Sequence, residues 1–203
     1  MRKTFFIFLL VGTFLLAGCS NAGITTKTQL IKESQIFEQN SHRQDTALSR
    51  LSKELEATVA LYDQLVPDSD LDELNVSLEA RDATVAELTK LNKAQAELSA
   101  TFKNTVKQDN KNFPISRLNR LTHSQDITTL DHETFMKYLD KAKETEQRVT
   151  DLYKNGQPDR SDLKAAVEST TQYYGALTQQ IEIWQVNAVR SKNNAESLVK
   201  SLK

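Results

Sequence analysis

The sequence predicts an all-α protein: an elongated, antiparallel, up-and-down four-helix bundle, or a pair of helical hairpins, with coiled-coil-like packing. One supporting observation is composition, because Ala, Leu, Lys, Glu, Gln and Thr dominate and only 5 Gly and 3 Pro occur in 203 residues; this mixture favours long helices. The other is the position of helix-stopping residues, which gather at 67–68, 110–114 and 155–158. The four segments so defined have about 40 residues each and would form helices about 60 Å long, which short turns force to run up and down.

The N-terminus has the pattern of a lipoprotein signal peptide. Two basic residues, Arg2 and Lys3, precede an apolar run over residues 5–16. This run is shorter than the roughly 20 apolar residues that cross a bilayer as a helix, so it is a targeting segment and not part of the fold. It ends in Leu16-Ala17-Gly18-Cys19, which resembles a bacterial lipobox. We therefore expect cleavage before Cys19 and a diacylglyceryl group on its thiol.

Cys19 is the only cysteine of the chain, so it cannot form an intramolecular disulfide, and lipidation explains its presence in an exported protein. Two acyl chains, such as palmitate, anchor a protein stably, whereas one holds it weakly. The alternatives are an ordinary secretory signal with a chance cysteine, or an apolar N-terminal anchor. The predicted organisation is a signal peptide over 1–18, a lipidated N-terminus and flexible linker over 19–26, and a helical domain over 27–203. The mature chain is then extracytoplasmic and lipid-anchored to the cell membrane, or to an outer membrane if the cell has one.

The first two predicted helices each carry an apolar stripe. We call the positions of a helix that face the other helices its seam. The first helix, from about 27 to 66, has apolar seam residues only in its C-terminal half: Leu48, Leu51, Leu55, Tyr62 and Leu65. Polar residues occupy its early seam positions (Ser34, Ser41 and Gln44), so we expect its first half to fray. The second helix, from about 69 to 108 with Ser69 as a candidate N-cap, has a stripe that drifts as in a straight helix of 3.6 residues per turn.

The other two predicted helices carry heptad seams. The third, from about 115 to 153, has polar residues in phase with its apolar ones: Gln125, Thr128, His132 and Glu146. A break at 127–129 would divide it, so its continuity is left open. The fourth, from about 159 and capped by Asp159 or Ser161, has an unbroken seam over about 40 residues, with alternating spacings of four and three. This spacing is typical of left-handed supercoil packing.

Charge and motifs argue against several function classes. Without residues 1–18, Lys+Arg falls from 26 to 24 against 27 Asp+Glu, a net charge of about −3. Nucleic-acid binding needs a concentrated basic face, and none is visible. The sequence also lacks GxSxG, SxxK and HExxH patterns. We therefore expect no nucleic-acid partner, no enzyme activity, no cofactor and no metal centre, with Cys19 as the one functional site.

Spacing in one acidic stretch imitates a calcium-binding loop. Asp68, Asp70 and Asp72 are followed by Glu79. Such a loop needs Gly at its sixth position for a sharp turn, and here that position is Glu73. The acids are better explained as neutralising the positive end of the second helix.

Histidines and aromatic residues fit packing better than ligand binding. The chain has three histidines: His42, His123 and His132. None of them pairs with another at helical spacing, and His132 is in phase with the seam of the third helix. Tyr174 and Trp184 also hold seam positions, which predicts core packing and not stacking on a sugar; Tyr173 lies just off the seam and fits either role.

With the lipobox and four long helices in hand, the chain resembles the YkyA-like family of cell-wall-binding lipoproteins of Gram-positive bacteria. The resemblance covers essentially the whole chain. It rests on Cys19 in its lipobox and on three local sequences: Leu65-Val66-Pro67-Asp68, Glu79-Ala80-Arg81-Asp82 and Asp151-Leu152-Tyr153-Lys154. It implies a membrane-anchored surface protein that binds the cell wall, and it brings no residue-level binding site.

Three functions remain open at this level. The first is a non-enzymatic surface lipoprotein that contacts the cell wall or a wall-associated protein. The second is a ligand- or metal-binding bundle that uses the polar seam residues Gln125, His132 and Glu146. The third is a docking subunit of an envelope complex, in which another protein's helix completes the weak early seam around Ser41 and Gln44.

Overall fold

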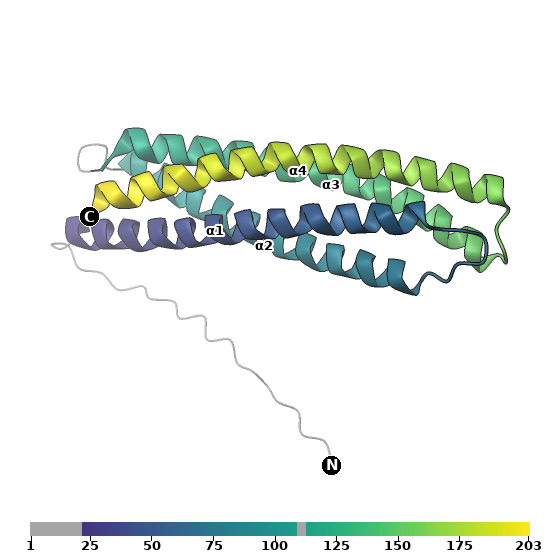
Figure 1. Ribbon diagram of the computed structural model, residues 1–203. Coiled ribbons are helices and arrows are strands. Elements are labelled where there is room, and N and C mark those ends of the chain that lie inside the picture. Colours follow the sequence, from purple (N-terminus) through teal and green to yellow (C-terminus); the bar gives the residue numbers. More distant parts are fainter. Residues whose placement is uncertain (1–21, 109–112) are drawn as a thin grey trace, which may run out of the picture.

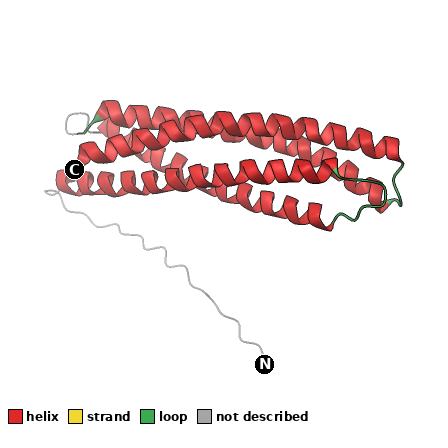
Figure 2. Ribbon diagram, viewed as in Figure 1, coloured by secondary structure: helices red, strands yellow, loops and turns green. Residues whose placement is uncertain are grey.

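The chain folds into four long helices and nothing else over the residues described in the computed structural model, 22–108 and 113–203. They are α1 (Ala22–Asp63), α2 (Asp72–Gln108), α3 (Ile115–Lys154) and α4 (Arg160–Leu202), as Figure 1 shows. Helices and their connecting turns account for all of the described chain (Figure 2). The predicted all-α fold with four helices is confirmed. The third helix is continuous through residues 127–129, which resolves the alternative that the sequence left open.

Over the described residues the helices form a ring in which each lies beside its two neighbours in sequence order, with α4 closing on α1. This is the up-and-down bundle expected from short turns. Across the core, the Arg81 guanidinium of α2 donates a hydrogen bond to the Tyr174 hydroxyl of α4. α1 begins and α4 ends at the same end of the bundle, while the α1–α2 and α3–α4 turns meet at the opposite end (Figure 1). We call these the proximal end and the distal end. At the distal end the Tyr153 hydroxyl donates a hydrogen bond of 2.8 Å to the Val66 carbonyl, which ties the two turns together.

Local chemistry explains where the helices stop. α1 ends at Asp63, ahead of Pro67, which disfavours helix in the residue before it. Ser69 is not an N-cap, because α2 begins at Asp72 and the Ser69 hydroxyl instead accepts a hydrogen bond of 3.0 Å from the Val66 amide. The predicted cap of α4 is confirmed: the Asp159 carboxylate accepts the amide hydrogen of Ser161 at 2.7 Å.

At its other end α1 begins earlier than expected. Its first residue is Ala22, five residues ahead of the predicted start at 27, so the helix includes the last part of the stretch assigned to a linker. Gly23 is the one residue of 22–26 with a strongly unfavourable helix propensity, and none of these five residues is a proline. The sequence of 22–26 is therefore compatible with a first helical turn.

Heptad spacing runs the length of all four helices. The expected drift in α2 is wrong, since its buried and half-buried seam keeps alternating steps of four and three: Leu74, Leu78, Arg81, Val85, Leu88, Asn92, Gln95, Ser99, Phe102 and Val106. The drift arises only when apolar residues alone are followed, because four members of the true seam are polar. In α1 the early polar residues Ser34, Ser41 and Gln44 are each 0% exposed inside the bundle, so the chain's own helices cover them.

The core consists of two apolar clusters separated along the bundle axis. The larger, distal cluster is centred on Leu51, Tyr174 and Trp184. The smaller, proximal cluster is centred on Phe37, Phe102 and Leu198, with the two phenylalanine rings 6.0 Å apart. Tyr174 and Trp184 are both fully buried, which confirms their assignment to the core, and Tyr173 packs half-buried against the same cluster.

Candidate functional site

The polar seam residues proposed as ligands do not meet at one point. Gln125, His132 and Glu146 all lie on α3, 7 and 14 residues apart. At 1.5 Å per residue these intervals place them about 10 Å and about 21 Å apart along the helix axis. A single ion or small ligand therefore cannot bind all three.

Glu146 forms an ion pair with Arg81, which occupies a seam position of α2 and is buried in the core. The Arg81 guanidinium, 1% exposed, forms an ion pair with the Glu146 carboxylate, and its second nitrogen donates to the other carboxylate oxygen at 3.1 Å. The Tyr174 hydroxyl donates to Glu146 at 2.8 Å. Although burial alone would lower the pKa of Arg81, its hydrogen bond to Glu146 raises it, and burial raises the pKa of the Tyr174 phenol. This closed network leaves Glu146 unavailable to a ligand.

His132 is a packing residue. Its ring packs edge-on against Trp184 with centroids 5.3 Å apart, and its Nε2 lies 3.0 Å from the Thr89 hydroxyl. Burial lowers the pKa of His132, which favours the neutral ring at physiological pH.

Between the two apolar clusters lies a layer of buried polar side chains, which we call the polar layer. All four helices contribute to it: Ser41 and Gln44 from α1, Asn92, Gln95 and Ser99 from α2, Gln125 and Thr128 from α3, and Ser191 from α4. Two hydrogen bonds cross it, from the Gln95 amide to the Ser41 hydroxyl at 2.9 Å and from the Gln125 amide to the Asn92 carbonyl oxygen at 3.1 Å. Neither polar atom of the Gln44 side chain has a hydrogen-bond partner among the described residues.

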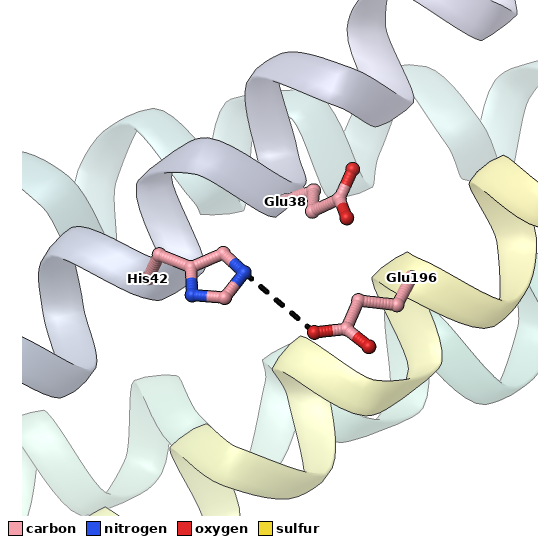
Figure 3. Close-up of side chains that lie close together, drawn as sticks. All are labelled: Glu38, His42 and Glu196. Atoms are coloured by element: carbon pink, nitrogen blue, oxygen red, sulfur yellow. Dashed lines mark ion pairs between the residues drawn. The ribbon is translucent and has the colours of Figure 1, made fainter.

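A second group of side chains, on the surface beside this layer, brings together three metal-ligating residues. Glu38 and His42 are one turn apart on α1, and Glu196 reaches them from α4 (Figure 3). One ligand atom from each lies within 4.8 Å of the other two. The His42 Nε2 is 3.6 Å from a Glu196 carboxylate oxygen, and the Glu38 carboxylate turns toward the same space (Figure 3).

This group was not predicted from the sequence, because it contains a single histidine and is divided between two helices. The i,i+4 spacing of Glu38 and His42 was a signal available in the sequence. The third member could not be found that way, since Glu196 lies more than 150 residues further along the chain and approaches only through the packing of α4 on α1.

The acidic stretch at the distal end does not wrap around an ion. α2 runs straight on from Asp72, so Glu79 lies seven residues, about 10 Å, along the helix axis from it. The Asp70 carboxylate accepts the Asp72 amide hydrogen at 3.2 Å, and Asp72 and Glu73 occupy the first turn of α2. Their negative charges offset the positive end of the α2 helix dipole.

Cys19, the predicted lipid-attachment residue, lies outside the described residues, as does the predicted signal peptide over 1–18. None of the helices in 22–108 and 113–203 combines the length and the apolar character needed to cross a membrane. In comparisons with known proteins, no family model, no curated protein and no solved structure matches this chain.

Proposed function

We propose that this chain is a non-enzymatic surface lipoprotein that is held on the membrane by Cys19 and contacts the cell wall or a wall-associated protein. The observation that carries the proposal is the lipobox Leu16-Ala17-Gly18-Cys19 placed directly ahead of a long helical bundle. A diacylglyceryl group supplies the two acyl chains that stable anchoring requires.

Geometry supports an upright arrangement. Cys19 precedes the first residue of α1, Ala22, by three positions, and three residues span at most about 11 Å. The proximal end of the bundle would therefore remain close to the bilayer. Helices of 37 to 43 residues are about 55–65 Å long, so the distal turns would face away from the membrane.

The distal end is then the natural contact surface. It presents the exposed Val66 side chain, 49% accessible, next to Asp68 and Asp70. The Tyr153–Val66 hydrogen bond holds the two turns in a fixed relation, which lowers the entropy lost when a partner binds there.

Three experiments test the proposal together. The mature protein should co-sediment with isolated cell walls. Alternatively, a photo-crosslinker at Val66 of the lipidated protein should capture an envelope partner. A control crosslinker at Thr28, which is exposed near the proximal end, should not capture that partner. Cys19→Ala should release the protein from the membrane fraction. Failure of both wall binding and distal crosslinking, in a protein that is membrane-bound, would rule out the contact function while leaving the anchor intact.

Two other functions receive less support. A ligand site made of Gln125, His132 and Glu146 is disfavoured by their separation along α3. A docking helix at Ser41 and Gln44 is disfavoured by their complete burial within the bundle.

A further inference from the structure

We propose that Glu38, His42 and Glu196 bind one divalent transition-metal ion of the zinc class and thereby fasten α1 to α4. This inference goes beyond the proposed surface function and does not depend on it. We call the three residues the α1–α4 metal site.

The donor set suits such an ion. Zinc binds imidazole nitrogen and carboxylate oxygen, and sites with three protein ligands leave the fourth position to water. Ligand atoms about 2.0–2.1 Å from a tetrahedral ion are about 3.4 Å from each other, and the His42 Nε2 and the Glu196 oxygen are already 3.6 Å apart. The widest separation in the group, within 4.8 Å, closes by rotation of half-buried glutamate side chains without any movement of the helices.

The backbone that carries the ligands is held by the core. Phe37 and Ser41, each next to a ligand on α1, are 0% exposed, and so is Ala195, next to Glu196 on α4. The ligands therefore border the buried seam where α1 and α4 pack. One turn further along, Lys192 of α4 pairs with Asp45 of α1 at 2.7 Å, which fixes the axial alignment of the two helices.

Electrostatics also favours a cation. Two carboxylates face one imidazole, so the group has a formal charge of −2 when His42 is neutral. Two of the neighbouring cations are engaged with other acids: Lys192 with Asp45, and Arg43 with Glu87 at 3.4 Å. Arg117 and Lys200 line a hollow on the far side of Glu196, where Arg117 donates to the Ser197 hydroxyl. A simple ion pair between His42 and Glu196 would contribute little, because their side chains are 55% and 31% exposed and exposed pairs are weak.

Such a link would act where α1 has the least apolar support. Between Phe37 and Ala47 every seam position of α1 is polar, at Ser41 and Gln44. A metal ion that joins α1 to α4 at His42 would restrain this half of α1, next to the polar layer. Metal occupancy should therefore slow local opening of residues 30–44.

Zinc binding can be measured directly on the chain from residue 19 onward with Cys19→Ser, which removes the only thiol. Isothermal titration with Zn²⁺ should show one ion per chain. Glu38→Gln, His42→Gln and Glu196→Gln should each weaken binding at least tenfold, while the matched controls Glu33→Gln and His123→Gln should leave it unchanged. All three ligands are at least partly exposed, so the variants should keep the parent's circular dichroism.

Two further readouts distinguish a built site from surface binding. Co²⁺ should give the visible absorption of a tetrahedral site in the parent and not in His42→Gln, and Zn²⁺ should slow amide hydrogen exchange over residues 30–44 in the parent alone. Zinc binding that is unaffected by His42→Gln, or Ca²⁺ and Mg²⁺ binding as tightly as Zn²⁺, would overturn the proposal. Neither result would bear on membrane anchoring or wall contact.

Discussion

Replacing Gln44 with leucine should stabilise the bundle. Gln44 is 0% exposed, and both its amide nitrogen and its carbonyl oxygen lack hydrogen-bond partners among the described residues. Each buried polar group without a partner costs about 1–3 kcal/mol. Leucine has a similar volume and continues the seam formed by Leu48, Leu51 and Leu55, so the substitution removes both polar groups without leaving a cavity.

We therefore expect Gln44→Leu to raise the free energy of unfolding by about 2 kcal/mol. In a chain of this length that corresponds to a rise in Tm of roughly 4–8 °C. Urea denaturation at 25 °C, followed by circular dichroism at 222 nm, measures the change, and an unchanged m-value would show that the unfolded state is unaffected.

Two matched substitutions complete the test. Gln125→Leu should be neutral or destabilising, because it removes the donor to the Asn92 carbonyl oxygen, which is itself buried. Gln29→Leu, on the exposed face of α1, should change stability by less than about 0.5 kcal/mol. If Gln44→Leu destabilised the protein by 1 kcal/mol or more, the Gln44 amide would have to be satisfied in solution, for example by buried water, and the reasoning would be wrong.

Three other substitutions test the rest of the core and the turns. Arg81→Met should lower the free energy of unfolding by about 3–5 kcal/mol, because it leaves the Glu146 carboxylate buried without its cation. The double variant Arg81→Met/Glu146→Leu should recover most of that loss. Denaturant midpoints that fall equally in both variants would contradict this expectation. Burial lowers the pKa of His132, so the unfolded state takes up a proton at a higher pH than the folded state does, and the free energy of unfolding should fall as pH drops below about 6.5. His132→Gln should flatten the plot of the free energy of unfolding against pH between 7.5 and 5. An unchanged slope would refute the buried, neutral state of His132. Gly156 has φ of +117°, and the position that a Cβ would occupy is open. Gly156→Ala should therefore cost about 1–3 kcal/mol from backbone strain alone, measured as a lower Tm, and an unchanged Tm would show that the turn relaxes.

Much of the fold could be predicted because heptad spacing is a local property. Counting alternating steps of three and four along the fourth segment places every seam residue from Leu163 to Leu202, and the structure buries or half-buries them all. In α2 the same spacing identifies the seam when polar residues are counted, and it fails only when apolar residues alone are followed. Arg81, Asn92 and Gln95 are in phase, and a seam position is defined by phase, whatever residue occupies it.

The contacts between helices could not be predicted, because they depend on axial alignment. Arg81 meets Glu146, and His42 meets Glu196, only at one relative offset of the helices. A shift of one heptad, about 10 Å, would give each of them a different partner while the seam of each helix still faced the core. Spacing within a helix carries no information about that offset, so the α1–α4 metal site and the Arg81–Glu146 pair emerge only from the packed bundle.

The alignment itself can be traced to the polar seam residues. Two apolar clusters alone would tolerate a shifted register, since leucines on one helix pack against leucines on the next with little discrimination. The polar layer does not tolerate a shifted register. A shift would place Gln95 or Gln125 opposite apolar side chains and break the hydrogen bond from Gln95 to Ser41 or from Gln125 to Asn92. The buried Arg81–Glu146 pair adds a second fixed point in the distal half, between α2 and α3. Polar residues in the core thus reduce the attainable stability and in return select one register, and that register is what brings Glu196 beside Glu38 and His42.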